Sequence, residues 1–444
     1  MTHPQAAPPF PETTLCSNLD RKDGRLRFAG QDTAELARTY GTPLYLMDED
    51  RIRYNCRLYQ RAFHDCFPAG SMVLYASKAA SFRQMCRIVQ AEGLGLDVVS
   101  SGEIHTAKTA GFPMERVYYH GNNKTDEDIA FAMDAGVGCF VVDGKEELLA
   151  LEVEAARRSL RQKVLLRITP GIDPHTYDAV STGKVDSKFG VSIETGQAEP
   201  FVRLALAQPH LNVAGLHCHV GSQVFWEDVF ERSVVVMMAF IRTVRDRCGY
   251  LPEELDLGGG YGVRYVESDP EIHIPRKIAS VAETLYAIAK RLDLPVPKVL
   301  MEPGRSIVAD AGLTLYTVGS VKEITGYKRY VSIDGGMSDN PRYALYGSQY
   351  TCFNAVRMDE PMDMRCDLVG KCCESGDVIQ PDVLLPQTTR RGDIVAVCTT
   401  GAYNFSMASG YNRLLRPPVV MLTGGKSYVA VQRETLDDLI RPER

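Results

Sequence analysis

The sequence lacks any segment that would take the chain into or across a membrane. No apolar run approaches the roughly 20 residues needed to span a bilayer, and the start, MTHPQAAPPFPETT, lacks the charged-then-apolar pattern of a signal peptide. Positive charge is not in excess either, since 50 Lys and Arg against 56 Asp and Glu give a net charge of -6. Nothing therefore favours binding to nucleic acid. We expect a cytoplasmic protein that acts on small molecules and begins with a mobile Pro-rich tail.

Closely spaced cysteine pairs are also missing. The twelve cysteines are scattered from Cys16 to Cys398 without a C-x-x-C pair, which favours free thiols in a reducing compartment. Hydrophobic residues make up 45% of the chain and charged residues 24%, as in globular proteins. The length of 444 residues predicts two or three domains, unless one of them is a large barrel.

From residue 43 onward, short apolar runs rich in β-formers alternate with longer amphipathic stretches, which is typical of repeated β-α units. A helix is predicted over 51–63, before the first of these strands. Eight strands separated by helical patterns predict an α/β fold, a (β/α)8 TIM-type barrel, with a doubly wound open sheet as the alternative. The predicted strands are 72–76, 95–99, 116–120, 139–142, 163–168, 213–220, 254–258 and 298–302.

After Arg305 the pattern changes to strand-period runs without long helices between them, which predicts a second, mostly β domain. The early stretch 26–41 does not fit the barrel pattern, so we expect the N-terminal segment to pack with the β domain. The predicted division is an N-terminal segment over 1–46, the barrel over 47–309 and the β domain over 310–444.

Polar residues gather where the predicted barrel strands end. In barrels of this kind the active site is built from those strand ends and the loops that follow them. The residues are Lys78 after the first strand, Asp97 in the second, His120 at the end of the third, His217 and His219 in the sixth, Gly258, Gly259 and Gly260 after the seventh, and Glu302, Gly304 and Arg305 after the eighth.

Three of these features together suit one cofactor. A lysine after an apolar strand forms a Schiff base if burial lowers its pKa, although most lysines are simply solvated. Three glycines at a strand end allow backbone N–H groups to approach a phosphate, although a tight turn explains them equally well. A carboxylate such as that of Glu302 keeps a pyridine nitrogen protonated, which pyridoxal-phosphate (PLP) chemistry requires; the alternative is an ordinary Glu–Arg surface pair.

The run HCHVGSQ leaves a metal site as a rival interpretation. Two histidines at strand spacing are expected to point the same way into the barrel mouth, where His120 and Asp97 would add ligands for zinc. A metal would leave the lysine, the glycines and the EPGR run without a shared purpose. We therefore favour PLP and predict no metal.

Eight runs of this sequence, in order, resemble the fold-type III PLP-dependent decarboxylases with their alanine racemase-like barrel, and within them the diaminopimelate decarboxylase family. The resemblance extends from about residue 40 to the C-terminal region. It implies PLP-dependent decarboxylation of meso-2,6-diaminopimelate to L-lysine and CO2, the last step of lysine biosynthesis. The runs are YASKAA, STGKVDSKFG, GLHCHVGSQ, LDLGGGYG, EPGRSIV, DGGMSDNPRYALYG, KCCESGD and GAYNFSMAS.

The resemblance also implies roles for individual residues. Lys78 would be the Schiff-base lysine, His219 rather than His217 would stack on the cofactor ring, and Glu302 would pair with the pyridine nitrogen. Cys373 would be the catalytic acid, contributed by the partner subunit of a homodimer. The other cofactor-binding residues implied are Asp97, Ser222, Gly258, Gly259, Gly260, Pro303, Gly304, Arg305 and Tyr403. The substrate-binding residues implied are Arg305, Arg342, Tyr346, Glu374 and Tyr403.

Two alternatives remain within this fold. One is a decarboxylase of ornithine, arginine or carboxynorspermidine, which Arg342 and Glu374 disfavour because a substrate without a distal carboxylate would leave guanidinium groups unpaired. The other is a non-catalytic PLP-binding regulator, which the presence of both Lys78 and Cys373 disfavours.

Overall fold

The fold is that of a computed structural model, which describes residues 18–173, 186–225 and 228–444. The predicted mobile tail lies outside these residues, as do positions 181–185 of the STGKVDSKFG run. The chain forms two compact units: a barrel unit of residues 53–262 and 271–306, and a second unit of the chain up to Ile52, 263–270 and 307–444. The predicted domain division at 46 and 309 stays a prediction.

Eight parallel strands close into a barrel. They follow one another in chain order around it, and β13 pairs with β5 to complete the ring. The predicted (β/α)8 barrel and the existence of its eight strands are confirmed, and the doubly wound sheet is wrong. The sixth and seventh strands end earlier than predicted, at His217 instead of residue 220 and at Asp256 instead of residue 258. The strands are β5 (Met72–Ala76), β6 (Gly95–Val98), β7 (Val117–Tyr119), β8 (Cys139–Val142), β9 (Gln162–Thr169), β11 (Leu211–His217), β12 (Glu254–Asp256) and β13 (Lys298–Met301), with a short β10 (Val191–Ser192) paired to β9.

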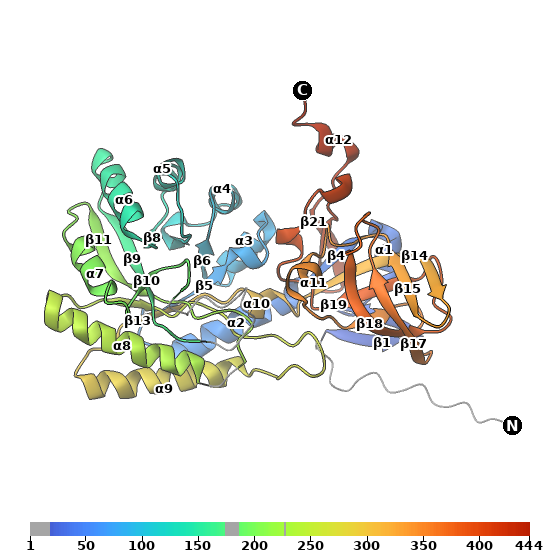
Figure 1. The fold of residues 1–444 in the computed structure, drawn as a ribbon, viewed down its shortest axis with the longest axis horizontal. Coiled ribbons are helices and arrows are strands. Elements are labelled where there is room, and N and C mark those ends of the chain that lie inside the picture. The colour runs from blue at the N-terminus through green and yellow to red at the C-terminus, as the bar shows by residue number, and fades with distance from the viewer. Residues whose placement is uncertain (1–17, 174–185, 226–227) are drawn as a thin grey trace. The chain divides into compact units, whose positions relative to one another are not determined.

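Helices lie on the outside of the barrel strands (Figure 1). The helix α2 (Glu49–Cys66) contains the predicted helix 51–63. Capping side chains mark where such helices begin, as at α5, where Thr125 and Asp128 form a reciprocal capping box. The other helices of this unit are η1 (Ser77–Ala79), α3 (Arg83–Ala91), α4 (Ser101–Ala110), η2 (Met114–Arg116), α5 (Asp126–Ala135), α6 (Lys145–Arg157), α7 (Ala198–Leu206), α8 (Val229–Cys248) and α9 (Ile274–Leu292).

An apolar layer joins strands from around the barrel. Leu74 of β5, Val141 of β8, Leu165 of β9 and Leu300 of β13 pack together and are almost fully buried. Since apolar side chains fill this layer, the carboxyl ends of the strands and the loops beyond them remain for polar chemistry.

The second unit is mostly β, as predicted. Its main sheet has the order β18-β17-β15-β14-β4-β20-β21, and β19 pairs with both β14 and β16. Its strands are β4 (Leu44–Asp48), β14 (Gly312–Ile324), β15 (Lys328–Ile333), β16 (Cys352–Asn354), β17 (Met362–Val369), β18 (Val378–Pro386), β19 (Ile394–Cys398), β20 (Val419–Thr423) and β21 (Lys426–Val431). Its helices are α1 (Thr33–Tyr40), α10 (Arg305–Val308), which starts at the end of the barrel unit, α11 (Arg342–Tyr346), η4 (Phe405–Met407), η5 (Tyr411–Arg413) and α12 (Leu436–Ile440).

The N-terminal segment contributes to the core of this second unit. It forms a small sheet of β1 (Leu19–Lys22), β2 (Arg25–Phe28) and β3 (Gln31–Asp32). Phe28 and Leu36 pack in one cluster with Leu313 and Leu315 of β14. Among the described residues, no helix is both long and apolar enough to cross a membrane.

Replacing Leu165 by Ala should destabilise the barrel, because the side chain is fully buried in the apolar layer and its removal leaves a cavity. We expect a cost of about 2–5 kcal/mol and a fall of more than about 4 °C in the melting temperature followed by circular dichroism. Leu160→Ala is the control, because Leu160 is 42% exposed. Equal melting temperatures for the two variants would contradict the packing described here.

Candidate active site

Lys78 lies in η1, directly after β5. Its Nζ donates to Oδ2 of Asp97 on the neighbouring strand β6, where Ala76 is the register partner of Asp97. The Asp97 side chain is completely buried, whereas 40% of the Lys78 side chain is exposed. The carboxylate therefore holds an accessible amine at the carboxyl end of the barrel.

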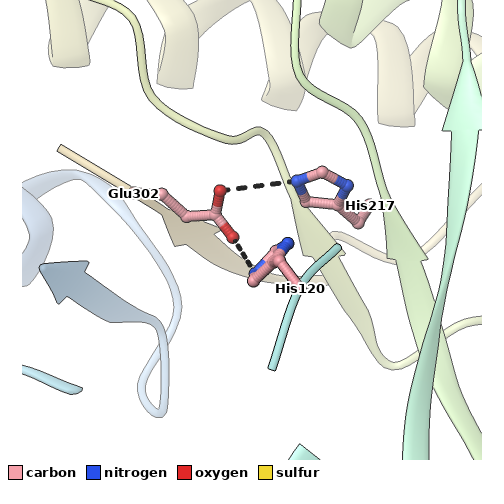
Figure 2. A group of neighbouring side chains, drawn as sticks. All are labelled: His120, His217 and Glu302. Atoms are coloured by element: carbon pink, nitrogen blue, oxygen red, sulfur yellow. Dashed lines mark ion pairs between the residues drawn. The ribbon is translucent and has the colours of Figure 1, made fainter. Parts of the chain in front are cut away.

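Glu302 lies one residue past β13, between two imidazoles (Figure 2). Its Oε1 is 2.7 Å from Nε2 of His120, and its Oε2 is 3.5 Å from Nε2 of His217. The two rings lie edge to face with their centroids 5.0 Å apart. All three side chains are buried, so the Glu302 carboxylate is surrounded by imidazoles, whereas an exposed carboxylate would be surrounded by water.

These imidazoles decide the charge of the cluster. Burial disfavours an ionised carboxylate, but the nearby His120 and His217 outweigh it and hold the pKa of Glu302 well below its ordinary value. Burial lowers the pKa of His217 to about 3, so this ring is neutral near pH 7. Glu302 is thus an ionised carboxylate in a buried site.

A second acid, Asp256 of β12, interacts with Glu302. Burial, followed by the charge of Glu302, raises the pKa of Asp256 well above its ordinary value. Its Oδ1 accepts a hydrogen bond of 2.9 Å from the backbone N–H of Gly258. Because the pKa of Glu302 is lowered and that of Asp256 is raised, Glu302 is the acid of this pair that ionises first.

The glycines at 258–260 allow several backbone segments to approach one another closely. Gly258 and Gly260 have φ of +67° and +121°, in the left-handed region that side chains disfavour. A Cβ on Gly259 would lie 2.1 Å from the carbonyl oxygen of Glu302, and one on Gly260 would lie 2.0 Å from that of Gly221. Only glycine fits these positions, and bare backbone of this kind is where phosphate groups bind.

His219 contacts the glycine run rather than the Glu302 cluster. β11 ends at His217, and two residues later Nδ1 of His219 accepts a hydrogen bond of 3.3 Å from the backbone N–H of Gly259. Burial lowers the pKa of His219 well below its ordinary value, so the ring is neutral. The two histidines of HCHVGSQ therefore serve different neighbours.

Among the described residues, the group that could hold a metal ion shares His120 and His217 with the set that the sequence suggested, but it has Glu302 in place of His219 and Asp97. The ligand atoms of His120, His217 and Glu302 lie within 4.8 Å of one another. His219 instead contacts the glycines and Asp97 holds Lys78. A metal and a pyridine nitrogen would therefore compete for the same carboxylate, that of Glu302.

The sequence analysis did not single out Asp256 or Arg167. Asp256 is the last residue of β12 (Glu254–Asp256), and Arg167 follows the apolar run 164–166 of β9, so their places near the carboxyl ends of two strands were the available signal. Arg167 is buried on β9, with Nε 3.8 Å from Oδ1 of Asp143 and its guanidinium 4.4 Å from the ring centre of Phe189. The sequence suggested His120 as a metal ligand and His217 as a metal ligand or a core histidine, and it did not predict their contact with Glu302.

Arg342 begins α11 in the second unit and is buried. Its guanidinium carbon lies 5.3 Å from the ring centre of Tyr265 and 5.7 Å from that of Tyr403. Nη2 donates to Oγ of Ser348 at 3.0 Å, and within the described part of the chain Nε has no hydrogen-bond partner. A buried cation with an unsatisfied donor is suited to bind an anion.

Cys373 and Glu374 lie in the loop between β17 and β18, and both are exposed in this chain. The backbone N–H of Cys373 donates to Oδ1 of Asn412 at 2.6 Å. The hydroxyl of Tyr411 donates to Oε2 of Glu374 at 3.3 Å. The loop is thus held by its backbone and by Glu374, while the Cys373 residue is exposed.

The predicted site residues divide between the two units. In the barrel unit they lie at or just past the carboxyl ends of strands, and there Nη2 of Arg305 donates to Oγ of Ser222 at 3.1 Å. The barrel unit contains Lys78, Asp97, His219, Ser222, Gly258, Gly259, Gly260, Glu302, Pro303, Gly304 and Arg305. The second unit contains Arg342, Tyr346, Cys373, Glu374 and Tyr403.

Comparison with known proteins identifies the family. Residues 49–309 match the family model of the pyridoxal-dependent decarboxylases, pyridoxal binding domain. The sequence is 43% identical to diaminopimelate decarboxylase of Bacillus subtilis over 96% of both chains, and 41% identical to that of Mycobacterium tuberculosis over 95% of both.

The fold gives the same result. A crystal structure of diaminopimelate decarboxylase from M. jannaschii in co-complex with L-lysine is similar with a TM-score of 0.89 and 34% identity, over 97% of this chain and 98% of that one. This likeness extends over both units and over the strands that carry Lys78 and Glu302. The chain therefore belongs to the pyridoxal-dependent decarboxylases, in the diaminopimelate decarboxylase family.

Proposed function

We propose that this chain uses PLP to decarboxylate meso-2,6-diaminopimelate to L-lysine and CO2. The observation that carries the proposal is an amine and an ionised carboxylate at the ends of adjacent strands of one barrel, Lys78 after β5 and Glu302 after β13. The cofactor is inferred from the family, which is pyridoxal-dependent. The substrate is inferred from relatives that match nearly the whole chain and are diaminopimelate decarboxylases.

The barrel residues fit PLP at each of its functional groups. Lys78 offers an amine for the covalent link, and Glu302 offers an ionised partner for the pyridine nitrogen. The backbone at 258–260, with Ser222, suits the phosphate, and the neutral ring of His219 suits stacking on the cofactor. When bound, PLP supplies an electron sink for the electron pair that the departing carboxylate leaves behind.

The chain's own residues then have separate tasks. Asp97 would hold the Lys78 amine at the carboxyl end of the barrel, where the covalent link to the cofactor would form. Glu302 would keep a proton on the pyridine nitrogen, and Asp256, whose pKa is raised by burial and by the charge of Glu302, would ionise less readily than Glu302. Loss of CO2 breaks a carbon–carbon bond, so one proton must reach the substrate carbon. We assign that proton to the thiol of Cys373, which regains one from solvent.

Selectivity is expected at the far end of the substrate, where meso-diaminopimelate has both a carboxylate and an ammonium. We assign the carboxylate to Arg342 together with Arg305, and the ammonium to Glu374. Tyr346 and Tyr403 would complete the substrate site. Ornithine or lysine has no distal carboxylate, so it would leave the buried guanidinium of Arg342 unpaired.

We also propose a homodimer with shared active sites, in which Cys373 and Glu374 enter the partner's barrel. Both residues are exposed in the single chain, as a loop that reaches a neighbour must be. A two-fold interface would place two such loops reciprocally. A cytoplasmic location stays a prediction as well.

The purified enzyme with PLP should convert meso-diaminopimelate to L-lysine and CO2 in equal amounts, measured by amino-acid analysis and CO2 release. Ornithine and lysine should turn over at least about 100-fold less efficiently in kcat/KM, as expected when a site built for a polar group receives a substrate without it. Comparable turnover of ornithine would instead favour a decarboxylase of another basic amino acid.

Lys78→Ala should abolish turnover and the visible absorbance band near about 420 nm, because the covalent link to the cofactor is lost. Lys108→Ala, at an exposed position of α4, is the matched control and should retain both. If Lys78→Ala kept the band and the activity, the cofactor assignment would have to be abandoned.

Arg342→Ala should lower kcat/KM for meso-diaminopimelate about 30-fold, because the distal carboxylate loses a charge-assisted pair. This factor corresponds to a loss of about 2 kcal/mol in transition-state stabilisation. Arg365→Ala, an exposed arginine of β17 in the same unit, should leave kcat/KM unchanged. Steady-state kinetics on both variants decides the matter, and an unaltered Arg342→Ala enzyme would remove Arg342 from the substrate site.

Mixing two inactive variants tests whether active sites are shared. Lys78→Ala subunits exchanged with Cys373→Ala subunits should recover towards about a quarter of the original activity, because half the dimers are mixed and each has one intact site. Native mass spectrometry confirms the exchange. No recovery despite complete exchange would place the lysine and the cysteine of each site in one chain.

A further inference from the structure

Two loops of the second unit leave the same end of its sheet. β15 and β17 are parallel neighbours, with Ser332 opposite Val369. The loop 334–341, which leads into Arg342, and the loop 370–377, which contains Cys373 and Glu374, therefore emerge together. A backbone hydrogen bond of 2.9 Å from Lys371 N–H to the Gly335 carbonyl already joins them.

One buried carboxylate, that of Asp377, binds both loops. Its Oδ1 accepts a hydrogen bond of 2.6 Å from the backbone N–H of Met337, and its Oδ2 accepts one of 2.7 Å from the backbone N–H of Cys372. Asp377 is 3% exposed. Short hydrogen bonds to a carboxylate are about twice as strong as neutral ones, so this pair of contacts is a strong connection between the loops.

Two glycines make room for this carboxylate. A Cβ on Gly336 would lie 2.5 Å from Oδ2 of Asp377, and one on Gly370 would lie 2.2 Å from the same atom and 2.4 Å from Cα of Gly336. Neither glycine has a left-handed backbone. Glycine is therefore required at both positions only because a side chain would clash with Asp377 or with the facing loop.

The segment after η4 supports both loops from outside. Ser409 N–H donates to the carbonyl oxygen of Ser338 at 2.8 Å, and Oδ1 of Asn412 accepts from the N–H of Cys373 at 2.6 Å. Cys373 is thus fixed by two backbone hydrogen bonds. Its own N–H donates to Asn412, and the N–H of the preceding residue, Cys372, donates to Asp377.

We propose that Asp377 is a positioning residue, which holds the loop of Cys373 and Glu374 and the loop of Arg342 as one rigid body. It touches no reacting atom itself. The inference rests on the proposed function and deepens it, because the loop that brings Cys373 and Glu374 to the partner's barrel is then fixed to the loop that leads into Arg342 of its own chain. A fixed position of this loop directs the thiol of Cys373 to the right carbon of the substrate.

Asp377→Asn tests this directly. An amide offers one acceptor oxygen in place of two and turns an NH2 group toward the other backbone N–H, so one loop is released. We expect kcat for meso-diaminopimelate to fall about 10- to 100-fold, with full cofactor content. The rate at which iodoacetamide alkylates Cys373, followed by peptide mass spectrometry, should change about threefold or more.

Asp382→Asn is the matched control, because Asp382 is an exposed acid of the adjoining strand β18. It should retain the kcat and the Cys373 alkylation rate of the unmodified enzyme. A residue that merely stabilised the fold would lower the melting temperature and the folded fraction, but it would leave KM and the alkylation rate of folded molecules unchanged. Wild-type kcat, KM and alkylation in folded Asp377→Asn would overturn the proposal.

A second pair of variants covers the case in which Asp377→Asn does not fold. Gly370→Ala places a methyl group against Oδ2 of Asp377 and should reproduce the loss of kcat, whereas Gly376→Ala in the same loop meets nothing nearer than 3.8 Å and should not. If neither Asp377→Asn nor Gly370→Ala folds, hydrogen exchange in the unmodified enzyme decides. Exchange of the Met337 and Cys372 amides as fast as in an unfolded peptide would then overturn the proposal.

The two proposals fail in distinguishable ways. An unmodified enzyme without activity on meso-diaminopimelate would contradict the proposed function. An active unmodified enzyme with fully active Asp377→Asn or Gly370→Ala variants would contradict only the role of Asp377.

Discussion

The chemistry of the barrel depends on keeping one negative charge buried at its carboxyl end. A carboxylate without partners in such a place would take up a proton, because leaving water costs it several kcal/mol. Glu302 avoids this because His120 and His217 flank it, each from a different strand. Burial and the charge of Glu302 raise the pKa of Asp256 beside it, so Glu302 is the acid that carries the negative charge. An ionised acceptor is what a pyridine nitrogen needs to remain protonated, and a protonated ring is what decarboxylation requires.

The same three side chains would also suit a metal ion. The family membership decides between the two, since the likeness to pyridoxal-dependent decarboxylases extends along nearly the whole chain. Lys78 and the glycines at 258–260 then have a purpose that a metal would not give them. In the proposed function the barrel unit carries the residues for the bond-breaking chemistry and Arg305, and the second unit carries Arg342, Glu374 and the proton donor Cys373.

Much of the fold could be predicted because its signals are local. Each barrel strand is a short apolar run between helical patterns, and the closed parallel barrel then places strand ends such as Lys78 and Glu302 at one face. The neighbours of a buried charge are set by strand pairing, which is not local. For this reason the sequence did not predict the contact of Glu302 with His120 and Asp256. It also did not predict that β11 ends at His217, so that His219 has different neighbours from His217. In the sequence Asp377 looks like any acidic residue of a loop, and its contact with a second loop can be predicted only once the pairing of β15 with β17 is known.

The most direct test of the buried charge is the protonation state of the cofactor nitrogen itself. The enzyme would be loaded with PLP labelled with 15N in the ring, and the nitrogen chemical shift followed by NMR in the unmodified protein and in Glu302→Gln. We predict a protonated nitrogen throughout the neutral pH range in the unmodified protein and an unprotonated one in Glu302→Gln, with the cofactor bound in both. An unprotonated nitrogen in the unmodified protein, or a protonated one in the variant, would contradict the role given to Glu302.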